Sequence, residues 1–397
     1  MKHRMLMAAG LIALAACAAD GAVDPPRETP SPDGGDGGTI VVEPEPTDAS
    51  APPDGDADAG VELPLVCGDA GFCETRIPTS KLGLPLSLQS VWMVAPNDVW
   101  SASAEGYVLH YDGTSWATAH QENRGLFAVW ATASSVWAGG EGGSLFRRSS
   151  DGTWARFETG RLGTVRAIYG TNDDDVWFAF SDETVSHFDG TTLTNHPVDI
   201  PGLRITTVFG RPGVGVYAAG YVESRTLSEE SGLYDHEPHL FELSPTEVVE
   251  FNPILPMLRG FAPLSGVVTD TPNEDQRISL VMLTGNDSFG MGFHFALGSE
   301  NLGTVQALGN DALFFDVSGS PLRPPHALFL PVWARNWDDI YIPAQVGAIL
   351  RWNETELTST SLKMGQDFVP RSVFGIHGNA TEAWLVGDGF ALKGATL

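Results

Sequence analysis

The apolar residues of this chain come in short stretches that are interrupted by turn-forming pairs. One stretch runs Leu88-Gln-Ser-Val-Trp92, breaks at Asn97-Asp98, resumes at Val99-Trp100, and breaks again at Asp112-Gly113. Asp-Gly and similar pairs between apolar stretches favour tight turns that join short strands. From residue 63 onward no stretch keeps apolar side chains at helical spacing for three turns. The pattern therefore predicts an all-β protein.

These stretches repeat along the chain. The second aromatic residue of each unit gives steps of 37, 40, 40, 124 and 43 residues, at positions Trp100, Trp137, Trp177, Tyr217, Tyr341 and Trp384. A period near 40 with several short strands is typical of a β-propeller blade. One thin sheet cannot cover its own faces, so we expect Trp100, Trp137 and Trp177 to fill the joints between neighbouring blades.

The number of blades depends on the long step. Six units are plain, and residues 251–327 hold one expanded blade or two. Candidate inner strands there are Ile278–Leu283 and Ala312–Phe315. We expect seven blades in residues 75–397, with eight as the alternative.

The chain ends indicate a closed ring. The last unit stops at Leu397, before its expected outer strand, and the segment from Thr75 to Leu86 precedes the first unit. We therefore expect an N-terminal strand to complete the last blade. The fourth unit carries an insertion, Val222 to His239, which we expect to project as a long loop on one rim.

The charge of the chain is strongly acidic. The 397 residues include 22 Lys and Arg against 50 Asp and Glu, a formal charge of -28, of which -19 falls on residues 63–397. Such a surface repels polyanions, which argues against nucleic-acid binding. Residues 18–62 hold 12 acidic side chains, eight prolines, seven glycines and no aromatic residue, so we expect residues 17–62 to form a disordered tether.

The first residues have the organisation of an export signal. Lys2 and Arg4 precede an apolar stretch that ends in Leu14-Ala15-Ala16-Cys17, so residues 1–16 read as a signal peptide. The Leu-Ala-Ala-Cys motif resembles the lipobox of bacterial lipoproteins. That resemblance implies that Cys17 becomes an acylated N-terminus, and Ala18 after it implies delivery to the outer membrane. The alternative is a plain secretory signal with an incidental cysteine.

Two further cysteines, Cys67 and Cys73, are the only others in the chain. In an oxidising compartment an even pair predicts a disulfide, here a small loop in a neck of residues 63–74. A metal site is the alternative, but it lacks a second ligand pair nearby.

The repeat resembles those of known propeller proteins. The aromatic residue, the Asp-Val-Trp step and the Asp-Gly-Thr-x-Trp step resemble the tandem propeller repeats of secreted bacterial proteins and lipoproteins, which are similar to Asp-box (BNR, sialidase-type) propellers. The resemblance covers residues 75–397 and implies a surface-displayed propeller.

Catalytic motifs are sparse. Thr75-Arg76-Ile77-Pro78 is similar to the Arg-Ile-Pro of sialidases, where the arginine grips a substrate carboxylate, but Asp151-Gly-Thr-Trp154 lacks one residue of a true Asp box. His236 and His239 flank a proline in the inserted segment, and a solvated loop explains them better than a metal site.

The remaining polar clusters have structural explanations. Asn97-Asp98, Asp173-Asp174-Asp175 and Asp338-Asp339 have oxygen ligands suited to Ca²⁺, yet their recurrence at one blade position favours turns in which the side chain bonds backbone amides two residues on. His110 and His187 fall inside repeat strands and are expected to be packed or edge histidines. We expect no catalytic residue, no metal ligand and no cofactor.

The sequence thus predicts a lipid-anchored propeller at the cell envelope that acts as a non-enzymatic binding or adhesion scaffold, with a monomeric body. Its protein or glycan ligand would bind on one rim or at the mouth of the central channel. The alternative is a carbohydrate-active, sialidase-like enzyme, which needs convergent carboxylates and arginines in a cleft. A purely structural role would require a large exposed apolar patch.

Overall fold

The computed structural model describes residues 67–68, 71–227, 234–250, 261–270, 276–284, 290–297, 331–336, 339–344, 348–353, 357–364, 367–368 and 372–395. The chain divides into two units, 1–62 and 63–397. The signal peptide, Cys17 and the tether lie outside the described residues. Within the described part, no helix has the length and apolar character needed to cross a membrane.

Six antiparallel sheets have four strands each, joined in a meander. The first three are formed by β2 (Leu88–Ala95), β3 (Asp98–Ser103), β4 (Tyr107–Tyr111) and β5 (Trp116–Gln121); by β6 (Leu126–Ala131), β7 (Val136–Gly140), β8 (Leu145–Arg148) and β9 (Trp154–Phe157); and by β10 (Val165–Asn172), β11 (Asp175–Phe180), β12 (Thr184–Phe188) and β13 (Leu193–Pro197). A short 3₁₀ turn, η1 (Glu141–Gly143), links β7 to β8.

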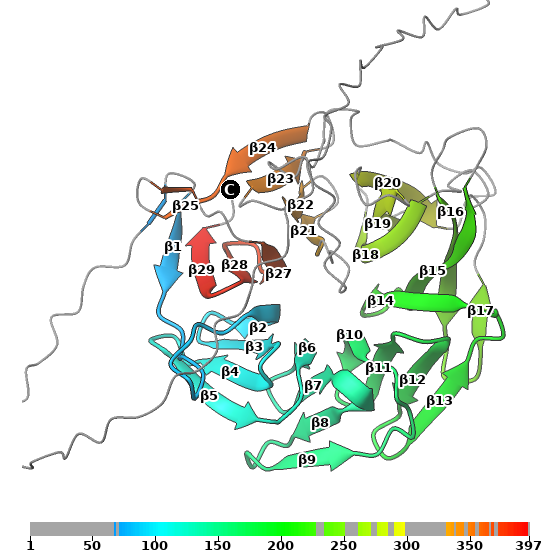
Figure 1. The fold of residues 1–397 in the computed structure, drawn as a ribbon, viewed down its shortest axis with the longest axis horizontal. Coiled ribbons are helices and arrows are strands. Elements are labelled where there is room, and N and C mark those ends of the chain that lie inside the picture. Colours follow the sequence, from blue (N-terminus) through cyan, green and yellow to red (C-terminus); the bar gives the residue numbers. More distant parts are fainter. Residues whose placement is uncertain are drawn as a thin grey trace, which may run out of the picture. The chain divides into compact units, whose positions relative to one another are not determined.

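The other three four-stranded sheets follow the same plan. They are formed by β14 (Leu203–Arg211), β15 (Gly215–Leu227), β16 (Tyr234–Leu243) and β17 (Val248–Glu250); by β21 (Trp333–Asn336), β22 (Asp339–Ala344), β23 (Ala348–Trp352) and β24 (Leu357–Ser361); and by β27 (Val373–Gly378), β28 (Glu382–Gly387), β29 (Phe390–Ala395) and β1 (Phe72–Thr75). The first strand of each sheet contacts the first strand of the next, so the sheets follow one another round a ring, from β2 to β27 (Figure 1). The chain is an all-β propeller, as the repeat predicts.

The predicted number of blades is wrong in detail. The described residues form six complete blades, where seven or eight were expected. Between β17 and β21 they form one three-stranded sheet of β18 (Phe261–Asp270), β19 (Gln276–Thr284) and β20 (Gly290–Leu297), whose β18 contacts both β14 and β21. The candidate strand Ile278–Leu283 lies in β19, and Ala312–Phe315 lies outside the described residues. A count based on 40 residues per blade fails here because three strands of ten, nine and eight residues form a single sheet in this stretch. A two-stranded hairpin of β25 (Lys363–Met364) and β26 (Asp367–Phe368) follows β24.

The prediction that an N-terminal strand completes the last blade is confirmed. Strand β1 pairs antiparallel with β29, and Phe72 stands opposite Gly394, where a Cβ would come within 2.6 Å of the phenylalanine ring. The strand begins at Phe72, however, in the segment expected to be the neck. The expected disulfide is also present, and it joins Cys73 of this strand to Cys67. The bridge therefore attaches the preceding chain directly to the strand that closes the ring.

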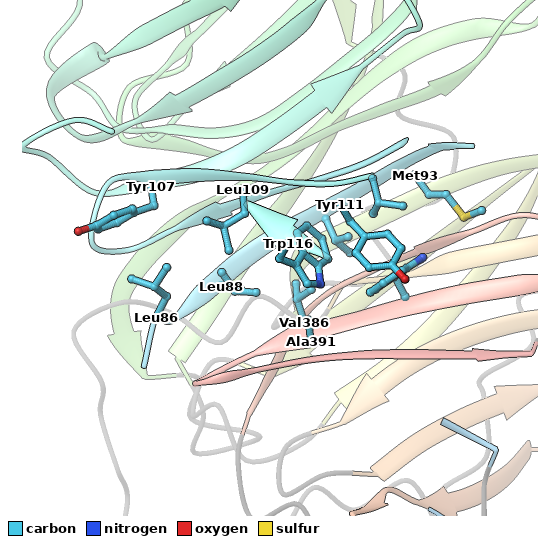
Figure 2. Packing of buried hydrophobic residues seen from close by; sticks show 12 residues of the cluster. Leu86, Leu88, Met93, Tyr107, Leu109, Tyr111, Trp116, Val386 and Ala391 are labelled. Carbon is cyan, nitrogen blue, oxygen red and sulfur yellow. The ribbon is translucent and has the colours of Figure 1, made fainter. Parts of the chain in front are cut away.

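Aromatic side chains fill the joints between blades, as expected. Trp100, Trp137 and Trp177 are at most 4 % exposed. The ring of Trp137 on β7 lies 5.0 Å from those of Phe178 and Phe188 in the next blade. Figure 2 shows the joint between the first and last blades, where Leu88, Leu109 and Trp116 pack with Val386 and Ala391.

A polar trio recurs at the aromatic position of three blades. An acidic residue is followed two positions later by an aromatic residue and twelve positions later by a basic one, in Asp98, Trp100 and His110, in Asp175, Trp177 and His187, and in Asp339, Tyr341 and Arg351. In the first trio Trp100 Nε1 donates to Asp98 Oδ1 at 2.7 Å, and His110 Nε2 lies 2.9 Å from the same oxygen. The histidine also stacks on the tryptophan, with ring centroids 4.1 Å apart.

The trio gives the aspartates of the acidic clusters a structural role in packing. Asp98 and Asp175 accept from an indole and an imidazole, and not from backbone amides as expected. The expected amide bond does form at Asn172, whose Oδ1 accepts from the Asp174 N–H at 2.9 Å. His187 is 4 % exposed, which confirms that it is a packed histidine.

The described residues of the fourth unit's insertion form a two-stranded ribbon and not the expected loop. Strands β15 and β16 continue beyond the start of β14, pairing Glu223 with His236 and Leu227 with Tyr234. His236 and His239 consequently lie within β16, where they are 6 % and 8 % exposed. His239 Nδ1 lies 2.8 Å from Glu250 Oε1 on β17.

Candidate functional site

The first strands of the sheets surround a central cavity of about 920 Å³. Residues from β2, β6, β10, β14, β18, β21 and β27 all line it, which makes it the channel of the propeller. Cavities of this size are typical of small-molecule sites. The architecture of these first strands therefore decides what the channel offers to a ligand.

A β-bulge occurs near the start of most of these strands. In β2, for example, Leu88 pairs with Ser103 and Ser90 with Ala102, which leaves Gln89 as the extra residue. A bulge adds an unpaired residue and re-aims its side chain. The equivalent residues that line the cavity, here called the mouth tier, are Gln89, Phe127, Arg166, Thr206 and Phe374.

The position after the bulge holds small residues in each of these strands. They are Ser90, Ala128, Ala167, Thr207, Ser265 and Gly375, and all of them line the cavity. Short side chains at one level of a channel leave space that larger ones would fill. We call this level the small tier.

Two positions further along lies an aromatic tier, to which β21 adds Trp333, whereas β18 has Val267 at this level. Its members face the buried aromatic residue of the second strand in the same register: Trp92 with Trp100, Trp130 with Trp137, Tyr169 with Trp177, Phe209 with Tyr217, Trp333 with Tyr341, and His377 with Trp384. By sequence alone Phe374 would be the last member, because it precedes a glycine as Tyr169 and Phe209 do. The register places His377 there instead and moves Phe374 to the mouth tier.

Glycines allow the aromatic tier to pack tightly. A Cβ at Gly170 would come within 2.6 Å of the Trp130 indole, one at Gly210 within 2.8 Å of the Tyr169 ring, and one at Gly266 within 2.5 Å of the Phe209 ring. Each aromatic ring thus lies against a glycine of the next sheet. This contact explains why glycine directly follows the aromatic residue at Tyr169 and Phe209.

Trp92 forms the centre of the tier. Its ring lies 6.2 Å from Trp130 in the next blade, 6.3 Å from Tyr169 in the blade after that, and 4.0 Å from His377 in the last blade. A side chain that approaches rings on three other blades must extend into the channel. Trp92, Tyr169 and His377 are half-buried, while Trp130 is 2 % exposed, so these three present the ring surfaces that a ligand can reach.

His377 is held in one protonation state. Its Nδ1 accepts a hydrogen bond from the Met93 N–H at 3.0 Å, and burial lowers its pKa to about 4. At neutral pH the ring is therefore uncharged and carries its proton on Nε2. Burial likewise raises the pKa of Tyr169, which keeps its phenol protonated.

Arg166 is the cation of the mouth tier. Its guanidinium lies 5.5 Å from the centre of the Phe127 ring. Burial lowers the pKa of Arg166, and the nearby Glu141 and Tyr221 act in the opposite direction. An arginine side chain remains charged even so. Glu141 begins η1 and accepts from the Gly125 N–H at 3.4 Å, while Tyr221 stacks on His236 at 4.8 Å.

The residues singled out by sequence motifs lie elsewhere. Arg76 is exposed and directly follows the outermost strand β1, and it is not among the cavity-lining residues. The described residues contain no group of three His, Cys, Asp or Glu side chains arranged to hold a metal ion. The mouth tier was missed because its side chains differ from blade to blade. One signal could have found it: each member stands three positions before a member of the aromatic tier.

No protein-family model matches the chain, and no curated protein matches it. The chain is similar to a solved structure of YCF48 bound to D1 peptide, with 13 % identity and a TM-score of 0.54, covering 84 % of this chain and 98 % of that one. It is similar to the structure of U3-55K, with 8 % identity and a TM-score of 0.56, covering 83 % and 99 %. YCF48 from Cyanidioschyzon merolae matches at 12 % identity and a TM-score of 0.51, covering 82 % and 99 %. At these identities the likeness concerns the fold alone, and what it identifies is a β-propeller.

Proposed function

We propose that this protein is a lipid-anchored, non-enzymatic binding scaffold of the cell envelope, and that it holds its ligand at the mouth of the propeller channel. The observation that carries the proposal is the cavity of about 920 Å³, with accessible aromatic rings at its centre and a charged, bulged tier at its mouth. A largely apolar pocket with a few convergent polar groups is the usual form of a binding site.

The chemistry of the lining residues supports binding over hydrolysis. The titratable side chains among the described lining residues are Glu141, Arg166, Tyr169 and His377. A sialidase-like hydrolase needs convergent carboxylates and arginines in its cleft, and this set offers one carboxylate and one arginine. The solved propeller described as bound to a D1 peptide is an example of a ligand-binding role for this fold.

The anchor is proposed from the sequence. The lipobox-like Leu14-Ala15-Ala16-Cys17 supports acylation of Cys17, and the 45 residues that follow it would span about 35 to 40 Å as a flexible coil. Metabolic labelling with an alkyne-tagged fatty acid tests this step. The wild-type protein should take up label and the Cys17→Ser variant should not; labelling that persists in the variant would contradict the anchor.

The binding role is tested by pull-down from solubilised envelope with the full-length protein. Trp92→Ser removes the central ring of the channel, and Trp154→Ser removes a half-buried tryptophan on the outer strand β9 as a matched control. We expect the captured material to be lost with Trp92→Ser and retained with Trp154→Ser. Equal capture by both folded variants would place the ligand outside the channel.

A further inference from the structure

Three features of the channel mouth together define a ligand class. The small tier leaves open space, the half-buried rings of Trp92, Tyr169 and His377 form a floor, and Arg166 stands three residues before Tyr169 on the same strand. Three residues of extended strand span about 10 Å. A ligand with one ring on the floor can therefore bring a substituent of that ring to the guanidinium.

The charge of Arg166 favours a negatively charged substituent on the ring of the ligand. Arg166 is the only Lys or Arg among the described residues that line the cavity. Its planar fork of donors matches a carboxylate in a bidentate arrangement. Because residues 63–397 carry a net charge of -19, the field of the body opposes anions and favours a ligand with one negative charge over a polyanion.

The rest of the mouth suits hydroxyl groups. Gln89 Nε2 already donates to Ser87, so the Gln89 oxygen and Glu141 are acceptors there, while Arg166 donates. A sugar presents several hydroxyl groups that need donors and acceptors together, and its C–H face packs on aromatic rings. An extended peptide would instead pair with an open strand edge, and the Met93 N–H on β2 is already bonded to His377.

We propose that the channel mouth binds an acidic saccharide unit, with its ring on Trp92 and its carboxylate on Arg166. This inference rests on the proposed binding function of the channel and gives it a chemical class. Glu141 and Gln89 contact the hydroxyl groups, and Tyr169 and His377 complete the floor.

The test uses the full-length protein and defined probes, followed by calorimetry and by tryptophan fluorescence. The probes are glucuronate and galacturonate, with glucose and galactose as neutral partners of the same shape. We expect each acid to bind at least tenfold more tightly than its neutral partner, with a preference that weakens as salt is raised. Trp92→Leu should weaken both members of each pair.

Variants locate the carboxylate. Arg166→Gln should abolish the preference for acids, and Arg166→Lys should restore part of it. Arg156→Gln is the matched control, since Arg156 is an exposed arginine on β9, 3.5 Å from Glu158, and it should leave binding unchanged. Circular dichroism of each variant confirms folding before the titration.

The outcomes separate this inference from the function it rests on. Equal binding of acids and neutral sugars, or an acid preference that survives Arg166→Gln, would overturn the role of the carboxylate. Benzoate and a short peptide serve as further probes: if only one of these binds, in a Trp92-dependent manner, the channel is a binding site but the saccharide assignment is wrong. If no probe responds to the loss of Trp92, the saccharide assignment fails, and the pull-down with Trp92→Ser decides the binding function separately.

Discussion

Trp92 on β2 and His377 on β27 stack with ring centroids 4.0 Å apart and planes inclined by 23°, across the joint between the first and last blades. The two residues are 285 positions apart in the chain. The same histidine accepts the Met93 N–H, so it links a backbone donor of the first blade to the last blade. The same imidazole therefore contributes both to the joint between the first and last blades and to the channel floor.

The uncharged state of His377 predicts a pH-dependent stability. Because burial lowers its pKa to about 4, from an unfolded value near 6.5, only the unfolded chain binds this proton between those values. The free energy of unfolding should fall as pH drops from 6.5 to 4, by at most about 3 kcal/mol from this residue. Urea titrations at several pH values measure the slope. His377→Asn, which keeps an acceptor for Met93 but does not titrate, should flatten it, and an unchanged slope in that variant would contradict the assignment.

The contact between Trp130 and Gly170 predicts a steric penalty. In Gly170→Ala the new Cβ would stand 2.6 Å from Cζ2 and 2.7 Å from Cη2 of the indole. Overpacking of this kind costs about 1 to 3 kcal/mol. Phenylalanine lacks both atoms, so Trp130→Phe should recover part of the loss in the double variant. A double-mutant cycle of unfolding free energies measures this coupling, and strict additivity would show that the ring does not press on Gly170.

The polar trios predict that removal of one carboxylate lowers the free energy of unfolding. Asp175 Oδ1 accepts from Trp177 Nε1 at 3.0 Å and from His187 Nε2 at 2.8 Å, both of them buried side chains. Asp175→Ala leaves these donors without their acceptor and should lower the free energy of unfolding by about 2 to 4 kcal/mol. Asp175→Asn keeps one acceptor oxygen and should cost less. Asp112→Ala, in an exposed turn, is the control and should cost less than either Asp175 variant.

The elements that the sequence predicted well share a physical basis. Each joint between blades needs a buried aromatic residue at the same position, as at Trp100, Trp137 and Trp177. The same requirement in successive blades produces a repeat that can be detected in the sequence. Closure by an N-terminal strand follows from the same logic, because an incomplete blade leaves an unpaired strand edge.

The sequence does not predict the features that differ from one blade to the next. Gln89 and Arg166 occupy equivalent bulges but have different chemistry, as expected for positions that face a channel and not a neighbouring blade. His377 stands where other blades have larger aromatic rings, so the sequence points to the nearby Phe374 as the equivalent residue. The ribbon of β15 and β16 was read as a loop because its polar side chains and proline conceal a pairing that depends on backbone hydrogen bonds.

The closing strand allows a last prediction, on what holds β1 in place. Phe72 is 2 % exposed and packs in a core cluster with residues of β27, β28 and β29, whereas the Cys67–Cys73 bridge closes a loop of only six positions. Phe72→Ala should cost about 3 to 5 kcal/mol through lost burial and the cavity that remains. Replacing both cysteines with serine should cost about 2 kcal/mol or less, because closing a short loop removes little entropy from the unfolded chain. Thermal unfolding of the two variants, measured side by side under non-reducing conditions, compares these costs. A larger loss from the serine variant would mean that the disulfide, and not the packing of Phe72, keeps the ring closed.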